Sequence, residues 1–368
     1  MSYTHIRWDI SEDRRTEYAI SSKTSQLARK TADAVAAKAE AVELSPRYAP
    51  EADMKQLKRL SVKTLSLFSG GGGLDLGFDR AGFTHYASYE ILKFAGETLR
   101  SNRPKWKVFS GENGDVTRQD WKSLLGTVDM VHGGPPCQPF SIAGRRMGKN
   151  DARDMFPEFV RCVDEIRPKA FMAENVPGFL SAKFSAYRKG LFTELAKYYE
   201  ITTFVVSSDE FGVPQARKRA ICIGVRRDLG KKFDHVTIRK ASDKRGVQSA
   251  LGLSLTSKDG PAPTLRSTLT GPRQTTSIAN STASVVRWKE YGIWPHGISP
   301  NATVARSFPT KDGTYRMCVE ECQIIQGFPL SWEFYGAVYQ RLGMIGNSVC
   351  PPVAYALAKA LRDQVFND

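Results

Sequence analysis

The sequence predicts an α/β fold, in which a mostly parallel sheet has helices on both faces and a smaller, loop-rich domain is attached. Three observations lead to this prediction. Short apolar runs alternate with helix-compatible segments over residues 63–227, as in sheets whose parallel strands are connected by helices. The first apolar run ends in a glycine-rich loop that leads into a helical segment. Residues 228–313 lose the alternation and are rich in Ser, Thr, Gly and Pro, and helical periodicity returns in 314–368.

The elements follow in order along the chain. Residues 1–62 are polar and charged around one Ala-rich stretch, which we interpret as an appended helical arm that packs loosely on the main body. Residues 63–227 would form the first part of the main domain, 228–313 the smaller domain, and 314–368 a segment that returns to the main domain. The predicted strands are 64–68, 85–90, 127–134, 170–175, 201–208 and 220–226, and the predicted helices are 74–83, 156–168, 317–328 and 351–365.

Composition limits the classes of function. The 368 residues include 53 Lys and Arg against 38 Asp and Glu, a formal charge of +15, which favours a polyanionic partner such as nucleic acid over a merely soluble basic protein. No apolar run approaches the roughly 18 residues that span a bilayer, and no secretory signal is visible, so we expect a cytoplasmic protein. The six scattered cysteines predict reduced thiols, and the spacing of Cys and His predicts no metal site.

The glycine loop at residues 70–73 follows one predicted strand and opens a helix, a position that suits a polar or anionic ligand group. It fails the dinucleotide pattern G-x-G-x-x-G, because Asp75 and Leu76 stand where the third glycine is needed. Glu90 ends the next predicted strand, where a carboxylate can accept hydrogen bonds from ribose hydroxyls. The loop therefore favours a nucleoside-containing cofactor without a pyrophosphate over NAD, although a surface carboxylate is the alternative for Glu90 alone.

Three later segments carry side chains suited to chemistry. Cys137 lies between prolines after a Gly-Gly at a strand end, where a nucleophile would be exposed at the ligand-binding edge of the sheet; a structural thiol is the alternative. Glu174 ends an apolar strand. Burying a carboxylate there costs free energy, which indicates a functional role for this side chain. Gln215, Arg217 and Arg219 alternate along the approach to a strand and therefore point to one face, which could also be a solvated edge.

Together these segments resemble the cytosine-C5 DNA methyltransferase family of bacterial restriction-modification systems. The resemblance covers residues 63–227 and 314–368; residues 228–313 correspond only by position, to the family's variable target-recognition domain, and residues 1–60 have no counterpart. It implies a Rossmann-like methyltransferase domain that depends on S-adenosylmethionine. The matching segments are FSGGGGLDLGF (68–78), GGPPCQPFS (133–141), ENV (174–176), QARKR (215–219), QGFP (326–329) and IGNSVCPPVAYALAKAL (345–361).

The resemblance implies transfer of a methyl group to C5 of a cytosine that has been rotated out of the DNA duplex. Cytosine C5 becomes nucleophilic only after a nucleophile adds at C6, and Cys137 would be that nucleophile. Glu174 would hold the Watson–Crick edge of the base, Arg219 would reach its O2 and steady Glu174, and Arg217 would support the loop. A base of unassigned identity would then remove the C5 proton as Cys137 leaves. The predicted catalytic residues are Cys137, Glu174, Arg217 and Arg219.

The cofactor implied by the resemblance is S-adenosyl-L-methionine. Phe68 would contact its adenine, the glycine loop its methionine end and Glu90 its ribose, and Asp115 would accept a hydrogen bond from the adenine amino group. Leu92 and Ile324 depart from the residues that the family often has there, which leaves the detail of the cofactor edge open. The predicted cofactor-binding residues are Phe68, Ser69, Gly70, Gly72, Gly73, Leu74, Glu90, Ile91, Asp115, Val116, Pro135, Asn347 and Ser348.

Double-stranded DNA is the implied partner. Residues 141–153 resemble the loop that closes over the flipped base, with Arg145 and Arg146 as phosphate contacts. In the smaller domain, Arg266 and Arg273 are candidates for reading guanine, each worth ~1–3 kcal/mol if bidentate, with phosphate contact as the alternative. Residues 288–297 resemble enzymes that act on short GG-N-CC palindromes. The predicted DNA-binding residues are Arg145, Arg146, Gln215, Arg266 and Arg273.

We expect a monomer that works in the cytoplasm on the nucleoid, with a cognate restriction endonuclease as its functional partner. Three other functions are less consistent with the sequence. An RNA (tRNA) cytosine-C5 methyltransferase shares the chemistry, but the long basic segment 228–313 favours duplex DNA. A catalytically silent DNA-binding regulator is disfavoured by the complete catalytic set, and an NAD-dependent thiol enzyme by the failed glycine pattern.

Overall fold

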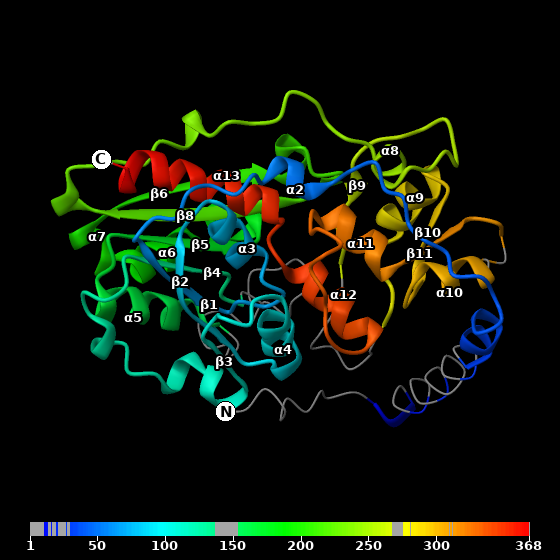
Figure 1. Ribbon diagram of the computed structural model, residues 1–368. Coiled ribbons are helices and arrows are strands. Elements are labelled where there is room, and N and C mark those ends of the chain that lie inside the picture. Colours follow the sequence, from blue (N-terminus) through cyan, green and yellow to red (C-terminus); the bar gives the residue numbers. More distant parts are fainter. Residues whose placement is uncertain are drawn as a thin grey trace.

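Among the residues that the structure describes, seven strands form one sheet in the order β3-β2-β1-β4-β5-β8-β6 (Figure 1). The strands from β1 to β5 pair in parallel, whereas β8 runs antiparallel to both β5 and β6, so the predicted mostly parallel sheet is confirmed. The sequence did not predict β3, which is only 3 residues long. The strands are β1 (Lys63–Leu67), β2 (Thr84–Glu90), β3 (Val108–Ser110), β4 (Met130–Gly133), β5 (Ala170–Asn175), β6 (Tyr199–Ser207) and β8 (Lys218–Arg226).

The computed structural model describes residues 11–13, 16, 20, 27, 30–136, 154–266, 275–279, 281–308, 310 and 312–367. Four residues predicted from the sequence to act in catalysis or DNA binding lie outside these described residues: Cys137, Arg145, Arg146 and Arg273. Within the described ranges, no helix is long and apolar enough to cross a membrane, and no cluster of His, Cys, Asp and Glu could hold a metal ion.

Helices cover both faces of the sheet. Met130 and Met172 pack into one hydrophobic cluster, while their neighbours Val131 and Phe171 pack into another on the opposite face. This alternation, with both faces buried, is what parallel strands covered on two sides require. The helices on the first face are α3 (Gly73–Arg80), α4 (Lys93–Asn102) and α13 (Pro351–Leu361), and those on the second are α5 (Phe156–Ile166), α6 (Ser185–Phe192) and α7 (Leu195–Tyr198) (Figure 1).

A third hydrophobic cluster lies in the smaller region and includes Leu265, Trp288 and Ile293. It also takes in Ile325 and Leu342, so residues on both sides of the predicted boundary at 313 share one core. The elements of this region are α8 (Val247–Leu251), β9 (Ala262–Pro263), α9 (Thr282–Glu290), β10 (Ile293–Ser299), α10 (Ala302–Ser307), β11 (Tyr315–Cys318), α11 (Val319–Gln326) and α12 (Val338–Asn347), and β9 pairs with the short β7 (Gln215–Ala216).

Residues 45–62, which we call the strap, run across both regions. Tyr48 is buried in the third cluster, and its backbone N–H donates to the carbonyl of Ala250 at 3.0 Å. Met54, just after the short helix α2 (Pro50–Asp53), is 1% exposed in the first cluster. Between them, Arg245 Nη1 lies 2.5 Å from Asp53 Oδ2. Residues 45–62, which follow the Ala-rich segment predicted as a loosely packed arm, are therefore packed against both regions.

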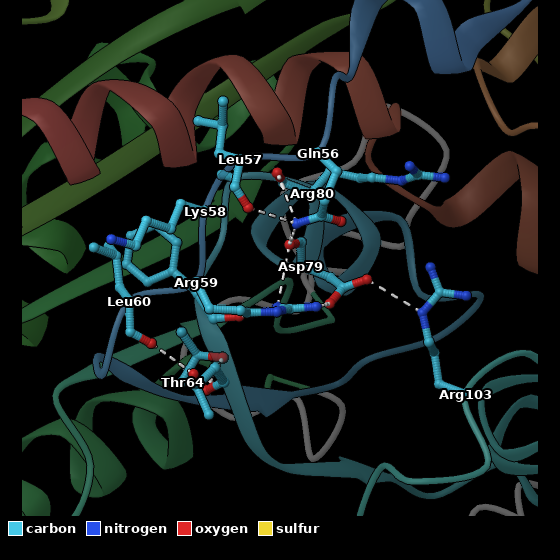
Figure 2. Close-up of polar contacts among 12 residues, drawn as sticks. Gln56, Leu57, Lys58, Arg59, Leu60, Thr64, Asp79, Arg80 and Arg103 are labelled. Atoms are coloured by element: carbon cyan, nitrogen blue, oxygen red, sulfur yellow. Dashed lines mark hydrogen bonds and ion pairs between the residues drawn. The ribbon is translucent and has the colours of Figure 1, made fainter.

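The end of the strap is fastened to the helix behind the glycine loop (Figure 2). Arg59 forms an ion pair with Asp79 of α3, and Arg103 Nε lies 3.2 Å from the other oxygen of the same carboxylate. Gln56 Nε2 donates to the Asp79 carbonyl at 3.0 Å. These contacts join residues about twenty positions apart, a distance over which the local pattern of the sequence carries no signal.

Replacing Met54 with Ala should lower the free energy of unfolding by about 2–5 kcal/mol, because it leaves a cavity under the strap. The control is Val42→Ala, whose side chain is 39% exposed and whose loss should change stability by less than about 0.5 kcal/mol. Urea denaturation followed by circular dichroism gives both values. Equal effects of the two changes would contradict a stabilising role for the strap.

Candidate active site

The glycine loop begins where β1 ends and turns sharply into α3. Phe68 and Gly70 both have a φ of 54°, and Gly72 a φ of 83°, all in the left-handed region. Gly73 is also needed for close packing, because a Cβ atom there would lie 2.1 Å from the carbonyl oxygen of Val349. The loop is therefore pressed against the chain that follows α12. That contact brings together two segments almost three hundred residues apart.

Glu90 at the end of β2 closes the loop from the other side. Its Oε2 accepts a hydrogen bond from the backbone N–H of Gly70 at 2.7 Å, and its Oε1 one from Leu92 at 2.8 Å. Burial raises the pKa of Glu90, against the opposing effect of these backbone donors. Each carboxylate oxygen can accept a second hydrogen bond, so the carboxylate can hold the loop and still accept from a ligand hydroxyl.

The other predicted cofactor residues lie around this loop with different exposures. Asp115 follows β3, the neighbour of β2, and its Oδ1 accepts hydrogen bonds from the N–H and hydroxyl of Thr117 at 3.0 and 2.7 Å. Ser348 donates to the Met344 carbonyl, and its Oγ would lie 2.8 Å from a Cβ placed on Gly71. Ser69, Leu74, Val116 and Pro135 are buried, Phe68 and Ile91 are half-buried, and Asn347 is exposed.

Replacing Glu90 with Gln should raise the KM for the methyl donor that the resemblance implies roughly 10- to 100-fold, because a charged acceptor would become an amide that cannot accept from both Gly70 and Leu92. The kcat at saturating donor should change little. Steady-state kinetics with varied donor measure both constants. Glu97→Gln, on the outer side of α4 with a side chain 52% exposed, is the matched control and should behave as wild type.

A second group of side chains lies at the ends of β5 and β8. These strands are antiparallel neighbours, and Arg219 Nε lies 2.6 Å from Glu174 Oε1. The Glu174 side chain is 10% exposed and that of Arg219 16% exposed. A Cβ on Gly134 would lie 3.1 Å from Glu174 Oε2, so the carboxylate also faces the backbone that leads to Cys137. The structure thus brings Glu174, Arg219 and the start of the Cys137 segment together.

Arg217 lies beside this pair and is 2% exposed. Its Nη1 donates to the Leu265 carbonyl at 3.3 Å, but among the described residues its Nε and Nη2 have no hydrogen-bond partner. Burial, together with the positive charge of Arg219, lowers the pKa of Arg217 to about 9. Buried N–H donors without acceptors are costly, so these donors need an acceptor from water, a ligand or the part of the chain outside the described residues.

Gln215 differs from the expectation of a DNA contact. It is fully buried, with its Oε1 accepting from the Leu265 N–H at 2.9 Å and its Nε2 donating to Gln326 Oε1 at 2.7 Å. Gln326 in turn donates to the Ser348 carbonyl at 2.7 Å. Two buried amides therefore connect the smaller region to the chain behind the glycine loop. Gln326 belongs to the QGFP segment, but its role is not visible in the sequence because its partners are remote along the chain.

Of the predicted DNA contacts, Arg266 is the one left on the described surface. It is exposed, and its N–H donates to the Ile278 carbonyl at 2.9 Å. Arg266 directly follows Leu265, whose backbone binds both Gln215 and Arg217, and its positive charge acts on Arg217. Cys137, Arg145, Arg146 and Arg273 lie outside the described residues, so their placement stays a prediction.

Comparison with known proteins matches residues 62–363 to one family, described as C-5 cytosine-specific DNA methylase. The Type II methyltransferase M.NgoMIV of Neisseria gonorrhoeae is 33% identical over 308 residues, covering 82% of this chain and 97% of that protein. The Type II methyltransferase M.NgoPII of the same organism is 31% identical over 329 residues, covering 82% of this chain and 95% of that protein.

Two solved structures share the fold. A putative DNA modification methyltransferase encoded within a prophage of E. coli gives a TM-score of 0.59 at 24% identity, covering 83% of this chain and 100% of that one. Spodoptera frugiperda DNMT2 gives a TM-score of 0.55 at 21% identity, covering 82% of this chain and 99% of that one. The matched family begins at residue 62, so most of the strap precedes it.

Proposed function

This chain belongs to the C-5 cytosine-specific DNA methylase family and is a DNA cytosine-C5 methyltransferase. From that premise, we propose that it moves the methyl group of S-adenosylmethionine to C5 of a flipped-out cytosine within a short, specific duplex sequence. The observation that supports this most directly is the Glu174 and Arg219 pair beside the unpaired donors of Arg217, at the backbone leading to Cys137. A carboxylate and guanidinium donors together match the N3, N4 and O2 edge of cytosine.

The residues divide the reaction between them. The Cys137 thiolate adds to C6, which turns C5 into a nucleophilic enamine carbon. Glu174 shares a proton with N3 and holds the amino group at C4, while Arg219 holds Glu174 and donates to O2 as charge develops on the ring. After the methyl group has transferred, a base removes the C5 proton, the C5–C6 double bond re-forms and Cys137 leaves as thiolate. Arg217 supports this pocket by its hydrogen bond to the Leu265 carbonyl, which holds the backbone of the smaller region beside it.

The family implies a methyl donor, and the residues at the ends of β1, β2 and β3 fit S-adenosylmethionine. Glu90 and Asp115 follow neighbouring strands, so their carboxylates lie at one edge of the sheet, where they would accept from ribose hydroxyls and from the adenine amino group. Phe68, at the end of β1, would pack on the adenine. When bound, S-adenosylmethionine would supply an activated methyl group, and the Gly70 loop would hold its methionine end.

The partner is DNA, and the finer points are proposals. The relatives are named Type II methyltransferases, which supports a modification enzyme with a cognate restriction endonuclease and disfavours the RNA and silent-regulator alternatives. One flipped base per event is compatible with a monomer. We place the enzyme in the cytoplasm on the nucleoid, where Arg145, Arg146, Arg266 and Arg273 would contact DNA.

The test is methyl transfer by the purified full-length protein. Plasmid DNA and tRNA are incubated with labelled S-adenosylmethionine, and bisulfite sequencing of the plasmid locates the modified cytosines. We expect label in the plasmid, confined to one short sequence, and none in tRNA. Label in tRNA alone would overturn the choice of substrate, and methylation at N4 or at adenine would overturn the chemistry.

A further inference from the structure

The smaller region contains a ribbon of three segments, joined by backbone hydrogen bonds, that starts at the candidate active site. Arg217 binds the carbonyl of Leu265 in the first segment, residues 264–266. The backbone N–H of Arg266 donates to the backbone carbonyl of Ile278 at 2.9 Å. The backbone N–H of Ile278 donates in turn to the backbone carbonyl of Pro295 at 2.9 Å. We call these three segments, 264–266, 276–278 and β10, the recognition ribbon. It extends from the base pocket across the smaller region.

Among the described residues, one face of the recognition ribbon is covered by the third hydrophobic cluster and the opposite face, which we call the uncovered face, is not. Ile293 and Ile298 of β10 are buried in that cluster, whereas Trp294 and His296 between them are only half-buried. On the uncovered face, the rings of Trp294 and His296 lie 4.9 Å apart, and Lys289 Nζ lies 4.7 Å from the centre of the Trp294 ring. A basic and aromatic face on the ribbon that begins at Leu265 is suited to nucleic acid.

The hydrogen bonds of Ser277 determine which nitrogen of His296 carries the proton. Ser277 Oγ lies 2.8 Å from the carbonyl oxygen of Ala279 and 2.6 Å from His296 Nδ1. A carbonyl oxygen can only accept and the hydroxyl has one hydrogen, so both contacts are satisfied only when Ser277 donates to Ala279 and Nδ1–H donates to Ser277. In the neutral ring, Nε2 then carries a lone pair.

The environment keeps the ring neutral. Burial, with the positive charge of Lys289 nearby, lowers the pKa of His296. Among the described residues, Nε2 of His296 has no hydrogen-bond partner, and it is left as an acceptor on the uncovered face. An acceptor held in this orientation can select a donor.

We propose that His296 is a specificity-determining residue, whose Nε2 accepts a hydrogen bond from an exocyclic amino group in the major groove. Adenine N6 and cytosine N4 are the donors that base pairs present there, whereas guanine N7 and O6 and thymine O4 are acceptors that would face the lone pair. The inference rests on the proposed function, because it assumes that DNA lies across the recognition ribbon when its cytosine enters the pocket.

The experiment begins from the target sequence of the wild-type enzyme, located by bisulfite sequencing. Duplexes that change one base pair of this sequence at a time are then compared by kcat/KM. Discrimination is the ratio of kcat/KM for the target duplex to kcat/KM for a duplex with one base pair changed. For His296→Ala, we expect this ratio to fall roughly 5- to 150-fold at one base pair and to stay unchanged at the others. Ser277→Ala frees the ring to exchange tautomers and should give a smaller loss at the same base pair.

Lys289→Ala is the matched control from the same face. It should weaken activity on all duplexes alike and make the salt dependence shallower, as a phosphate contact would. The KM for the methyl donor should be unchanged in all three variants, which reports an intact catalytic domain. If His296→Ala does not fold, the Ser277→Ala profile decides.

Unchanged discrimination, or an equal loss at every base pair, would overturn the role of His296 while the wild-type activity stands. At the affected base pair, purine in place of adenine or 2-pyrimidinone in place of cytosine removes the amino group that Nε2 would accept from; a wild-type kcat/KM that this replacement leaves unchanged would overturn the acceptor assignment. Absence of methylation on any DNA by the wild-type enzyme would instead overturn the proposed function, and this inference with it.

Discussion

Cys137→Ser is expected to reduce methyl transfer at least about a thousand-fold, because a serine hydroxyl is not ionised near neutral pH and adds poorly to C6. Without that addition, C5 of cytosine does not attack the methyl group. Labelled-methyl transfer to plasmid DNA measures the loss. A duplex with 5-fluorocytosine at the target adds a direct reading, because fluorine cannot leave as a cation and the wild-type enzyme should remain covalently bound after transfer.

The matched control is Cys162→Ala. This thiol is buried in α5, and burial raises the pKa of Cys162 well above its usual value, so it cannot serve as a thiolate nucleophile. Its loss should leave kcat within a few-fold of wild type and the 5-fluorocytosine adduct intact. An adduct that survives Cys137→Ser would refute the assignment of the nucleophile.

Glu174→Gln should lower kcat by roughly 10²- to 10⁴-fold, since the amide cannot share a proton with N3 in the same way. The KM for DNA should change much less, because most DNA contacts lie elsewhere. Arg219→Gln should also lower kcat, and the double variant should lose less than the product of the two single losses, because the two side chains are in contact at 2.6 Å. Single-turnover kinetics with saturating donor measure the chemical step.

Glu194→Gln serves as the control for this change of charge. Its side chain is 64% exposed and, among the described residues, pairs with Lys197 on the surface, so kcat should not change. Fully additive losses for Glu174→Gln and Arg219→Gln would contradict the role of Arg219 in holding the carboxylate. A KM effect without a kcat effect would reassign Glu174 to binding alone.

The sequence predicted best what depends on local pattern. The strand at 170–175 was predicted residue for residue, because an apolar run followed by a polar residue and then Val-Pro defines both ends of a buried strand. The placement of Glu174 at the end of that strand followed directly. Arg217 and Arg219 were predicted to share a face from their spacing, and both do lie beside Glu174.

What depends on remote partners was not predicted. Gln215 shares the spacing of Arg217 and Arg219, yet it binds Leu265 and Gln326 instead of pointing to a ligand, because the backbone of the smaller region passes directly over it. The Ser277 contact that fixes His296 likewise joins two segments of the smaller region, where the sequence has no helical or strand periodicity. The unpaired donors of Arg217 could be recognised only once its other neighbours were placed.

The strap also bears on how the protein should be produced. The recognised family sequence begins at residue 62, and a truncated gene designed from that match would omit Tyr48, Met54 and the carboxylate that pairs with Arg245. Such a product would expose apolar surface on both regions and would be prone to aggregation in expression hosts. Purification tags and fusion partners therefore belong ahead of the strap, and the minimal soluble unit is longer than the shared catalytic sequence.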